Sequence, residues 1–181
     1  MKDALQKTLA DIVSELESRS LSYALVGGLA ASVRGRIRVT DDVDLVVKCD
    51  IDQALSLIRS MDREKFVPLT TDAEIIARTA FLIPLVHHLT GVQLDLAVGI
   101  SGFEQQIVRR ATPIMLGGQE LNVASAEDLI LMKLLAGRPQ DEQDIQGIVE
   151  IQGSAIDWDY CLSVAEQLEE AVSIDMVSKV R

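Results

Sequence analysis

The sequence predicts an α+β protein, with a mixed β-sheet flanked by helices and a helical C-terminal portion. Three observations predict this fold. Short apolar runs bounded by turn residues alternate with helical periodicity up to about residue 124. After Ser125 every remaining segment has the pattern of a helix. Apolar residues make up 48% of the 181 residues but aromatics only 3%, so the predicted core is aliphatic. We expect a sheet domain over residues 1–124 and a helical portion over 125–181 packed on it as one compact unit.

The elements follow in chain order from their periodicity and from their capping residues. The first part of the chain is expected to contain helices over 3–19, 29–33, 51–61 (capped by Asp50) and 72–80, and strands over 23–26 and 42–47. Two hairpins are expected, one from 81–88 and 92–98 with Pro84 at a free edge or bulge, and one from 113–116 and 120–123 around Gly117-Gly118. The remaining helices are expected over 101–110, 126–137, 139–151 and 158–172, the last anchored in the core by Trp158 and Tyr160.

Charge and composition exclude several classes of protein. The net charge of −11 argues against a protein that grips a long nucleic acid, because phosphate neutralisation requires basic clusters. It leaves room for a small phosphate site. The apolar runs are far shorter than a membrane span, and Cys49 and Cys161 have no metal-type spacing. We expect a cytoplasmic protein with two reduced thiols and no membrane partner.

The first candidate site is an acid pair on a strand. Because side chains alternate along a strand, Asp42 and Asp44 point to one face, with their Cα atoms roughly 7 Å apart. Two carboxylates so placed repel each other unless a cation lies between them, and hard divalent cations prefer oxygen ligands. An Asp-x-Asp pattern alone is more often a solvated strand than a metal site.

A third acid strengthens the metal hypothesis. Asp95 interrupts the aliphatic strand over 92–98, where an acid is poorly suited to a sheet. If this strand lies beside the first, Asp42, Asp44 and Asp95 share one side, which is the arrangement that two-metal phosphoryl transfer requires. Asp95 as a hairpin residue facing solvent remains the alternative.

A glycine pair lies upstream of these acids. Gly27 and Gly28 follow a short strand and precede a helix, so their backbone N–H groups would face a ligand at a helix N-terminus, as phosphate sites do. On its own, such a pair is usually only a turn.

Together these residues resemble a known superfamily. Leu25-Val26-Gly27-Gly28, thirteen intervening residues and Asp42-Val43-Asp44-Leu45 are similar to the signature of the DNA polymerase β-like nucleotidyltransferases, and Asp95 falls where that superfamily carries its third carboxylate. Arg34, Arg36, Arg38 and Thr40 resemble the basic and threonine positions that precede the acid pair in bacterial members. The resemblance implies Mg²⁺ or Mn²⁺ at Asp42, Asp44 and Asp95, and a nucleoside triphosphate (NTP) held by Gly27, Gly28, Arg38 and Thr40.

A segment of the C-terminal portion narrows the resemblance. Lys133 lies in an otherwise apolar helix, and a buried lysine needs an anionic partner, either a triphosphate or a nearby aspartate. The segment 133–145 looks like the Lys, Arg, Asp-x-x-Asp segment of AbiEii-type toxin nucleotidyltransferases. This likeness implies that Lys133 binds the nucleotide, with support from Arg138, Asp141 and Asp144.

The leading hypothesis is therefore metal-dependent transfer of a nucleoside monophosphate from an NTP to an acceptor hydroxyl. The acceptor is RNA or protein if the chain is toxin-like, in which case an antitoxin partner is possible. The alternatives are a small-molecule acceptor, as for antibiotic nucleotidyltransferases, and a non-catalytic nucleotide-binding module.

Overall fold

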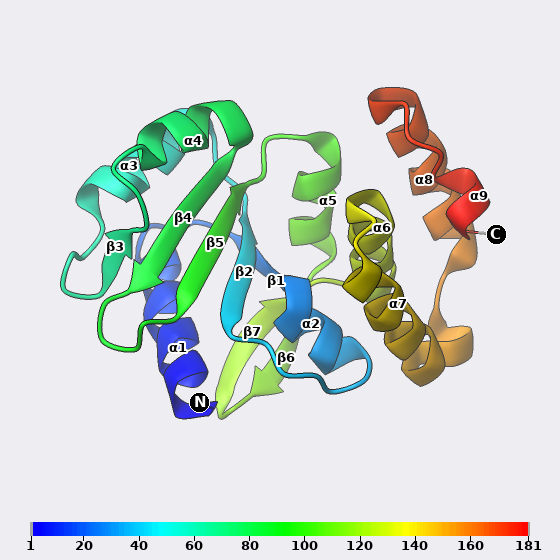
Figure 1. The fold of residues 1–181 in the computed structure, drawn as a ribbon, viewed down its shortest axis with the longest axis horizontal. Coiled ribbons are helices and arrows are strands. Elements are labelled where there is room, and N and C mark those ends of the chain that lie inside the picture. Colours follow the sequence, from blue (N-terminus) through cyan, green and yellow to red (C-terminus); the bar gives the residue numbers. More distant parts are fainter. Residues whose placement is uncertain (1, 181) are drawn as a thin grey trace. The chain divides into compact units, whose positions relative to one another are not determined.

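A computed structural model describes residues 2–180, which form two compact units (Figure 1). The first, here called the sheet unit, comprises the described residues up to Leu29 together with Val39–Ala124. The second, the helical unit, comprises Ala30–Arg38 together with the described residues from Ser125 onward. The chain passes between the units three times, after Leu29, Arg38 and Ala124. The first crossing lies inside α2 (Gly27–Arg34), whose first turn belongs to the sheet unit.

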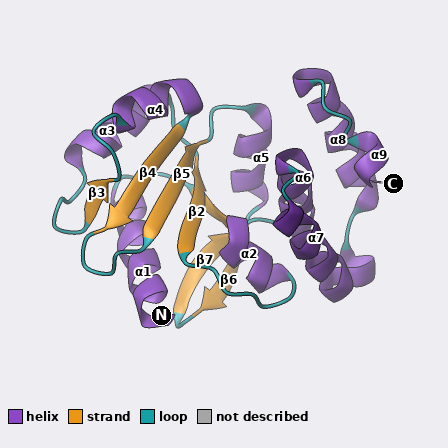
Figure 2. Ribbon diagram, in the orientation of Figure 1, coloured by secondary structure: helices purple, strands orange, loops and turns teal. Residues whose placement is uncertain are grey.

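The sheet unit is built on a seven-stranded mixed sheet in the order β3-β4-β5-β2-β1-β7-β6 (Figure 2). Its strands are β1 (Tyr23–Val26), β2 (Asp42–Val47), β3 (Phe66–Pro68), β4 (Leu82–His87), β5 (Gln93–Val98), β6 (Thr112–Leu116) and β7 (Gln119–Val123). The pairs β2–β5 and β1–β7 are parallel, and the other neighbours are antiparallel. Both predicted hairpins, β4–β5 and β6–β7, are present.

The helices of the sheet unit are α1 (Lys2–Ser18), α3 (Ile51–Ser60), α4 (Ala73–Ala80) and α5 (Gly102–Arg110), of which α1 and α5 contact β2. On one face of the sheet the strand residues are aliphatic and almost inaccessible, and they include Leu25, Val43, Leu45, Leu94 and Leu96. Asp50 and Ser101 cap α3 and α5 with complete capping boxes, as their positions predict.

A buried polar network joins α1 to the β4–β5 hairpin. The imidazole of His87 is inaccessible to solvent, and its Nε2 atom lies 3.0 Å from Asp11 Oδ2. Its Nδ1 atom accepts the backbone N–H of Thr90 at 3.2 Å and lies 2.9 Å from the Thr90 hydroxyl. Lys7 and Lys65 each lie 3.2 Å from the Asp11 carboxylate. Although burial raises it, these contacts hold the pKa of Asp11 below its ordinary value.

The helical unit packs α6 (Ala126–Ala136) against both α7 (Pro139–Gln152) and α8 (Trp158–Val172). A short 3₁₀ turn over Gly153–Ala155 follows α7, and α9 (Val177–Val180) contacts α8. The segment Ala30–Arg38 lies on α7 with a very close backbone approach: a Cβ placed on Gly35 would be 2.7 Å from the carbonyl carbon of Gly147. Only glycine at position 35 permits that contact.

The structure corrects some of the predicted details. The helix expected at 29–33 begins two residues earlier, so the glycine pair forms its first turn. The short strand β3 and the helix α9 were not predicted. Trp158 is 38% exposed and does not anchor α8 in the core, whereas Tyr160 donates a hydrogen bond from its hydroxyl to the buried Asp128.

Two further expectations concern the chain as a whole. Cys49 and Cys161 are free and buried, as expected. Within residues 2–180, none of the helices has both the length and the apolar character needed to cross a bilayer.

Candidate functional site

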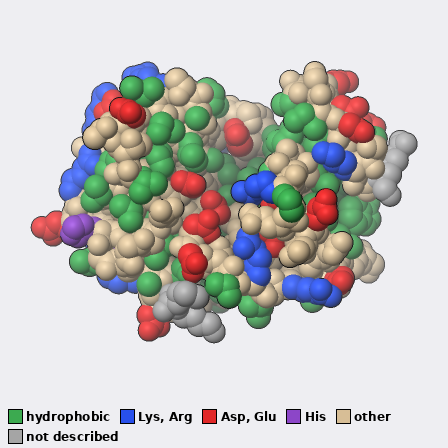
Figure 3. Space-filling view, viewed as in Figure 1, with side chains coloured by type: hydrophobic (Ala, Val, Ile, Leu, Met, Phe, Trp, Pro, Cys, Tyr) green, Lys and Arg blue, Asp and Glu red, His purple; other side chains and the backbone are tan. Residues whose placement is uncertain are grey.

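The strand register brings two of the three predicted acids into adjacent positions. Asp44 of β2 is the direct parallel partner of Asp95 on β5, and it is also the antiparallel partner of Val26 at the end of β1. Asp42 lies two residues earlier on the same strand and so on the same face. The alternate residues of these strands, such as Val43, Leu45 and Leu94, lie on the other face and are buried. A space-filling view of the acid-bearing face shows acidic side chains grouped over β2 and β5 (Figure 3).

Gly27 makes room for one of these acids. Its φ angle of +66° lies in the left-handed region, where glycine meets no steric penalty. A Cβ at this position would lie 1.8 Å from Oδ2 of Asp44, so the carboxylate occupies the space that any other side chain would need. Because α2 begins at Gly27, the glycine pair combines this close approach with a helix N-terminus.

The other two acids differ in their surroundings. The hydroxyl of Thr40 donates a short hydrogen bond to Oδ1 of Asp42, which ties the loop before β2 to the carboxylate. Loss of hydration within the sheet raises the pKa of Asp95, and the negative charge of Asp42 raises it further. The mutual repulsion expected of carboxylates on one face is therefore present at Asp95.

The residues suit a hard divalent cation in their chemistry. They offer only carboxylate oxygens, and the negative charge of Asp42 is, after loss of hydration, the second cause of the raised pKa of Asp95. Their side chains are not drawn together into a finished cage. Among the residues that the structure describes, no three His, Cys, Asp or Glu side chains are gathered closely enough to hold an ion.

The remaining predicted site residues form a second group, inside the helical unit. Lys133 of α6 is buried, and its Nζ atom lies 2.6 Å from Asp144 Oδ2 and 3.3 Å from Asp141 Oδ1. The other oxygen of Asp144 forms an ion pair with Arg38, whose Nε atom is 2.8 Å away. Of the two partners considered for Lys133, the aspartates are the ones in contact with it.

The second aspartate of this group holds another arginine. Asp141 accepts hydrogen bonds from the backbone N–H of Arg138 at 3.0 Å and from its Nε at 2.9 Å. Burial alone would raise the pKa of Asp141, but these hydrogen bonds and the charge of Lys133 hold it below its ordinary value. All five residues of this group, Arg38, Lys133, Arg138, Asp141 and Asp144, are thus connected through two carboxylates.

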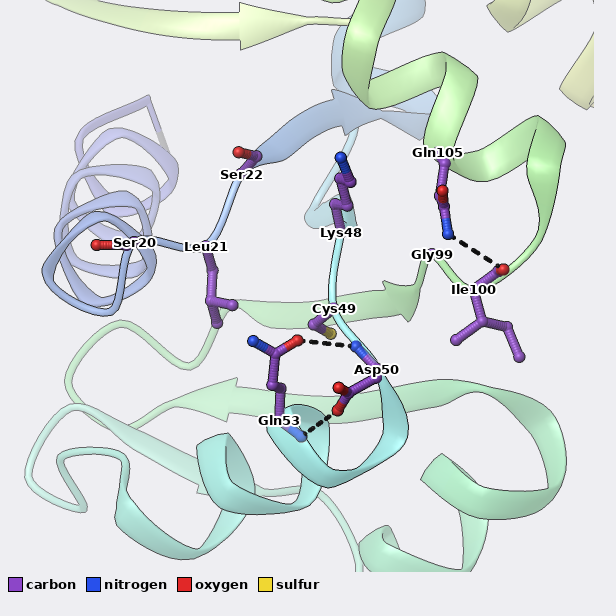
Figure 4. Close-up of a pocket in the computed structure, with 10 residues that line it drawn as sticks. All are labelled: Ser20, Leu21, Ser22, Lys48, Cys49, Asp50, Gln53, Gly99, Ile100 and Gln105. Carbon is purple, nitrogen blue, oxygen red and sulfur yellow. Dashed lines mark hydrogen bonds between the residues drawn. The ribbon is translucent and has the colours of Figure 1, made fainter.

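A pocket of about 500 Å³ lies elsewhere in the sheet unit (Figure 4). Its lining includes Ser22, which precedes β1, and Lys48, which follows β2, so it is at the opposite end of these strands from Asp42 and Asp44. Asp50 and Gln53 line it too, but they bond to each other in the capping box of α3. No motif in the sequence indicates this pocket, because its residues come from three separate loops and from the first turns of α3 and α5.

A family comparison adds to this geometry. Residues 4–180 match the model of a family described as nucleotidyltransferase of unknown function (DUF6036). The chain belongs to this family. It is a nucleotidyltransferase, and the match extends over both units. Among curated proteins, no sequence matches this nucleotidyltransferase.

Solved structures share the fold of this nucleotidyltransferase at low sequence identity. The antibiotic-resistance factor ANT(2'')-Ia has a TM-score of 0.61 and 14% identity, covering 96% of this chain and 97% of that one. An antigenic nucleotidyltransferase-like protein from Paracoccidioides brasiliensis has a TM-score of 0.57 and 20% identity, covering 96% and 91%. The lincosamide antibiotic adenylyltransferase LnuA, bound to lincomycin, has a TM-score of 0.57 and 16% identity, covering 80% and 96%.

Proposed function

We propose that this nucleotidyltransferase moves a nucleoside monophosphate from an NTP to an acceptor hydroxyl with the help of Mg²⁺ or Mn²⁺. The observation that carries the proposal is the pairing of Asp44 with Asp95 across β2 and β5, with Asp42 on the same face. Three carboxylates on one face of a sheet, next to a glycine turn, form the donor set that a phosphoryl-transfer enzyme needs for its metal ions.

Each acid has a stated role in the proposal. Asp42 and Asp44 would hold the ions, and Asp95 would join them and receive the proton of the acceptor hydroxyl. A bound divalent ion would supply charge neutralisation on the triphosphate and a lowered pKa for the hydroxyl. The raised pKa of Asp95 supports this assignment, since it makes that carboxylate a better base than an ordinary aspartate.

The nucleotide would be held through its phosphates. The N–H groups at the start of α2, at Gly27 and Gly28, and the hydroxyl of Thr40 are the proposed contacts in the sheet unit. By the resemblance of the sequence, Arg38 and Lys133 are proposed as further nucleotide-binding residues, with Arg138, Asp141 and Asp144 in support.

A small hydroxyl-bearing molecule is the acceptor class that the fold comparisons favour. ANT(2'')-Ia is an antibiotic-resistance factor and LnuA is a lincosamide antibiotic adenylyltransferase, and this chain covers 97% and 96% of their lengths. The net charge of −11 also disfavours a large polyanionic acceptor.

RNA or protein is the second acceptor class, and it rests on a different observation. The segment 133–145 resembles the corresponding part of AbiEii-type toxins, which would bring a toxin role and an antitoxin partner. Both acceptor classes share the same metal and nucleotide chemistry, and both are compatible with action in the cytoplasm.

One experiment tests the reaction and identifies the acceptor. The full chain is incubated with labelled NTPs and Mg²⁺ or Mn²⁺, and label is followed into hydroxyl-bearing drugs, total RNA or the protein itself. Asp42→Asn and Asp44→Asn should abolish transfer, while the neighbouring exposed Asp41→Asn should retain it. Undiminished transfer in both Asp42→Asn and Asp44→Asn would contradict the proposal. The pool that acquires label decides between the acceptor classes.

A further inference from the structure

The sheet face that carries the three acids continues beyond Asp95 onto β4 and β3. Asp95 is the antiparallel partner of Pro84 on β4. Val86, two residues further along β4, pairs with Val67 on β3. The N–H of Leu69 donates to the carbonyl oxygen of Pro84 at 3.0 Å, so the pairing extends one residue beyond β3. Because directly paired residues point to the same face, aliphatic side chains lie beside the acids on one surface of the sheet.

This aliphatic part of the face is open to solvent. We call its partly exposed residues the apolar platform, which consists of Val67, Leu69, Leu82 and Val86. Leu69 is 50% exposed, and the other three are half-buried. Toward β1 the same face is closed, since Ala24 and its partner Val46 are inaccessible. Hydrophobic side chains are visible over β4 next to the acidic group (Figure 3). The open part of the face is therefore on the far side of Asp95 from β1.

The geometry of phosphoryl transfer determines on which side of the acids the acceptor must lie. The attacking and leaving oxygens are roughly in line, with the transferred phosphorus between them. The triphosphate is proposed to lie at Gly27 and Gly28, which directly follow β1. The strand order β4-β5-β2-β1 puts β4 on the opposite side of the acid-bearing strands from β1. The acceptor hydroxyl therefore approaches Asp95 from the side of β4, which places the body of the acceptor over the apolar platform.

The platform also limits the chemistry of the acceptor. Among the described residues of β3, β4 and β5 on this face, Asp95 alone is ionisable, and it is a proposed metal ligand. A polycation would find no other carboxylate on these strands, and a polyanion would find no cation. Aliphatic side chains also lack the rings on which nucleic-acid bases stack. In contrast, an uncharged molecule with an apolar face gains from burial on the platform without desolvating a charge.

We propose that the apolar platform is the acceptor subsite and that the acceptor is a small, uncharged alcohol with an apolar face. Its hydroxyl oxygen bonds to the α-phosphorus as the bond from that phosphorus to pyrophosphate breaks, and the hydroxyl proton passes to the carboxylate of Asp95. Leu69 and Val86 act as specificity-determining residues through their contact with the apolar face. This inference rests on the proposed function, because it names the acceptor class of that same reaction.

Two variants test the subsite. Leu69→Asn and Val86→Thr each place a polar group on the platform with little change in side-chain size. Each should lower kcat/KM for the acceptor about tenfold to a hundredfold, as the loss of an apolar contact in a substrate pocket does. The KM for the NTP and the binding of Mn²⁺, measured by calorimetry, should not change. Leu89→Asn is the matched control, since Leu89 is 68% exposed in the turn between β4 and β5, outside the platform. It should transfer as the wild type does.

The assay offers labelled NTPs and Mn²⁺ to the full chain with separate pools of uncharged alicyclic and aromatic alcohols, polyamine sugars, and short single-stranded RNA. Label in the uncharged alcohols, with weaker transfer by both platform variants, upholds the inference. Label in polyamine sugars, in RNA or on the chain itself, or full transfer by the folded platform variants, overturns it while the reaction stands. A wild type that labels no pool overturns both. If urea unfolding shows that Val86→Thr is not folded, the surface variant Leu69→Asn decides alone.

Discussion

One carboxylate oxygen of Asp44 occupies the space where a side chain at Gly27 would begin. The separation between Oδ2 and a Cβ built on Gly27 is 1.8 Å, far less than any real contact. The glycine of the turn and the acid of β2 are therefore one structural feature, although they are separated in sequence by a helix and a loop.

This relationship predicts that Gly27→Ala abolishes nucleotidyl transfer, because the methyl group must displace the Asp44 carboxylate. The matched control is Gly91→Ala. Gly91 has a similar φ of +71° but no atom within 4 Å of its Cβ position. Gly91→Ala should therefore lower the unfolding free energy by only about 1 kcal/mol, because alanine is disfavoured in the left-handed backbone conformation. Activity and urea unfolding are measured for both variants. A Gly27→Ala protein with normal activity would show that Asp44 is not fixed as the structure has it.

Asp95 is predicted to reduce the stability of the fold at neutral pH. The pKa of Asp95 in the folded chain is raised above 3.8, its value in the unfolded chain. Between the unfolded and the folded pKa, the folded chain still holds a proton that the unfolded chain has lost. Stability falls through that window, and the full penalty remains above it. Asp95→Asn should therefore gain stability over the wild type from acid to neutral pH in EDTA, while losing transfer activity.

Thermal unfolding of both proteins from pH 3 to pH 8 checks the sign of this effect. An Asp95→Asn protein whose advantage shrinks with rising pH would contradict it. Asp42→Asn should show part of the same gain, since the charge of Asp42 is the second cause of the raised pKa. A stability gain on removal of a functional acid is the usual sign of a site selected for chemistry over stability.

The close approach of Gly35 to Gly147 predicts that Gly35→Ala loosens the segment Ala30–Arg38. The added Cβ would lie 2.7 Å from the backbone of α7, which cannot move as a flexible side chain can. We expect a loss of about 2 kcal/mol or more in unfolding free energy, comparable to overpacking in a core. In contrast, Gly102→Ala has no neighbour within 4 Å and lies at the start of a helix, so it should be neutral or slightly stabilising.

Replacement by alanine is predicted to destabilise the chain at His87 and to have little effect at His88. His87→Ala removes the contacts with Asp11 and Thr90 and the edge contact with the Phe66 ring, so it should destabilise the chain by about 3 kcal/mol. His88 is exposed, and His88→Ala should stay within about 0.5 kcal/mol of the wild type. Equal stability of the two variants in urea would contradict a structural role for His87.

Most of the sheet was predictable because its signals are local. Alternation located β2 and β5, and the Gly117-Gly118 pair located the β6–β7 hairpin, where both glycines have positive φ. Strand β3 is three residues long and ends at Pro68. A strand this short does not show a recognisable alternation of apolar and polar residues. Its existence depends on pairing with β4, a tertiary effect.

The candidate site was predictable in its residues and only partly in its contacts. Asp95 stood out as an acid in an apolar strand, but its pairing with Asp44 rather than Asp42 is a matter of register. The sequence left a triphosphate and an aspartate as equal partners for Lys133. The deciding signal is the turn at Gly137, which folds α7 back on α6 and brings Asp141 and Asp144 to the lysine. The contact of Gly35 with Gly147 could not be predicted from the sequence, because neither glycine lies in a recognisable sequence motif and the two are far apart in the chain.

The divided composition of the helical unit has a consequence for biosynthesis. Residues 30–38 leave the ribosome early, but α7, against which Gly35 packs, is made only after the whole sheet has been translated. During that interval Arg38 has no Asp144 to pair with. The nascent chain thus contains its acid-bearing strands before it can complete the charge cluster of Arg38, Lys133 and the two aspartates. Because each unit is made of two separate segments, no single cleavage of the finished chain could release one unit intact from the other.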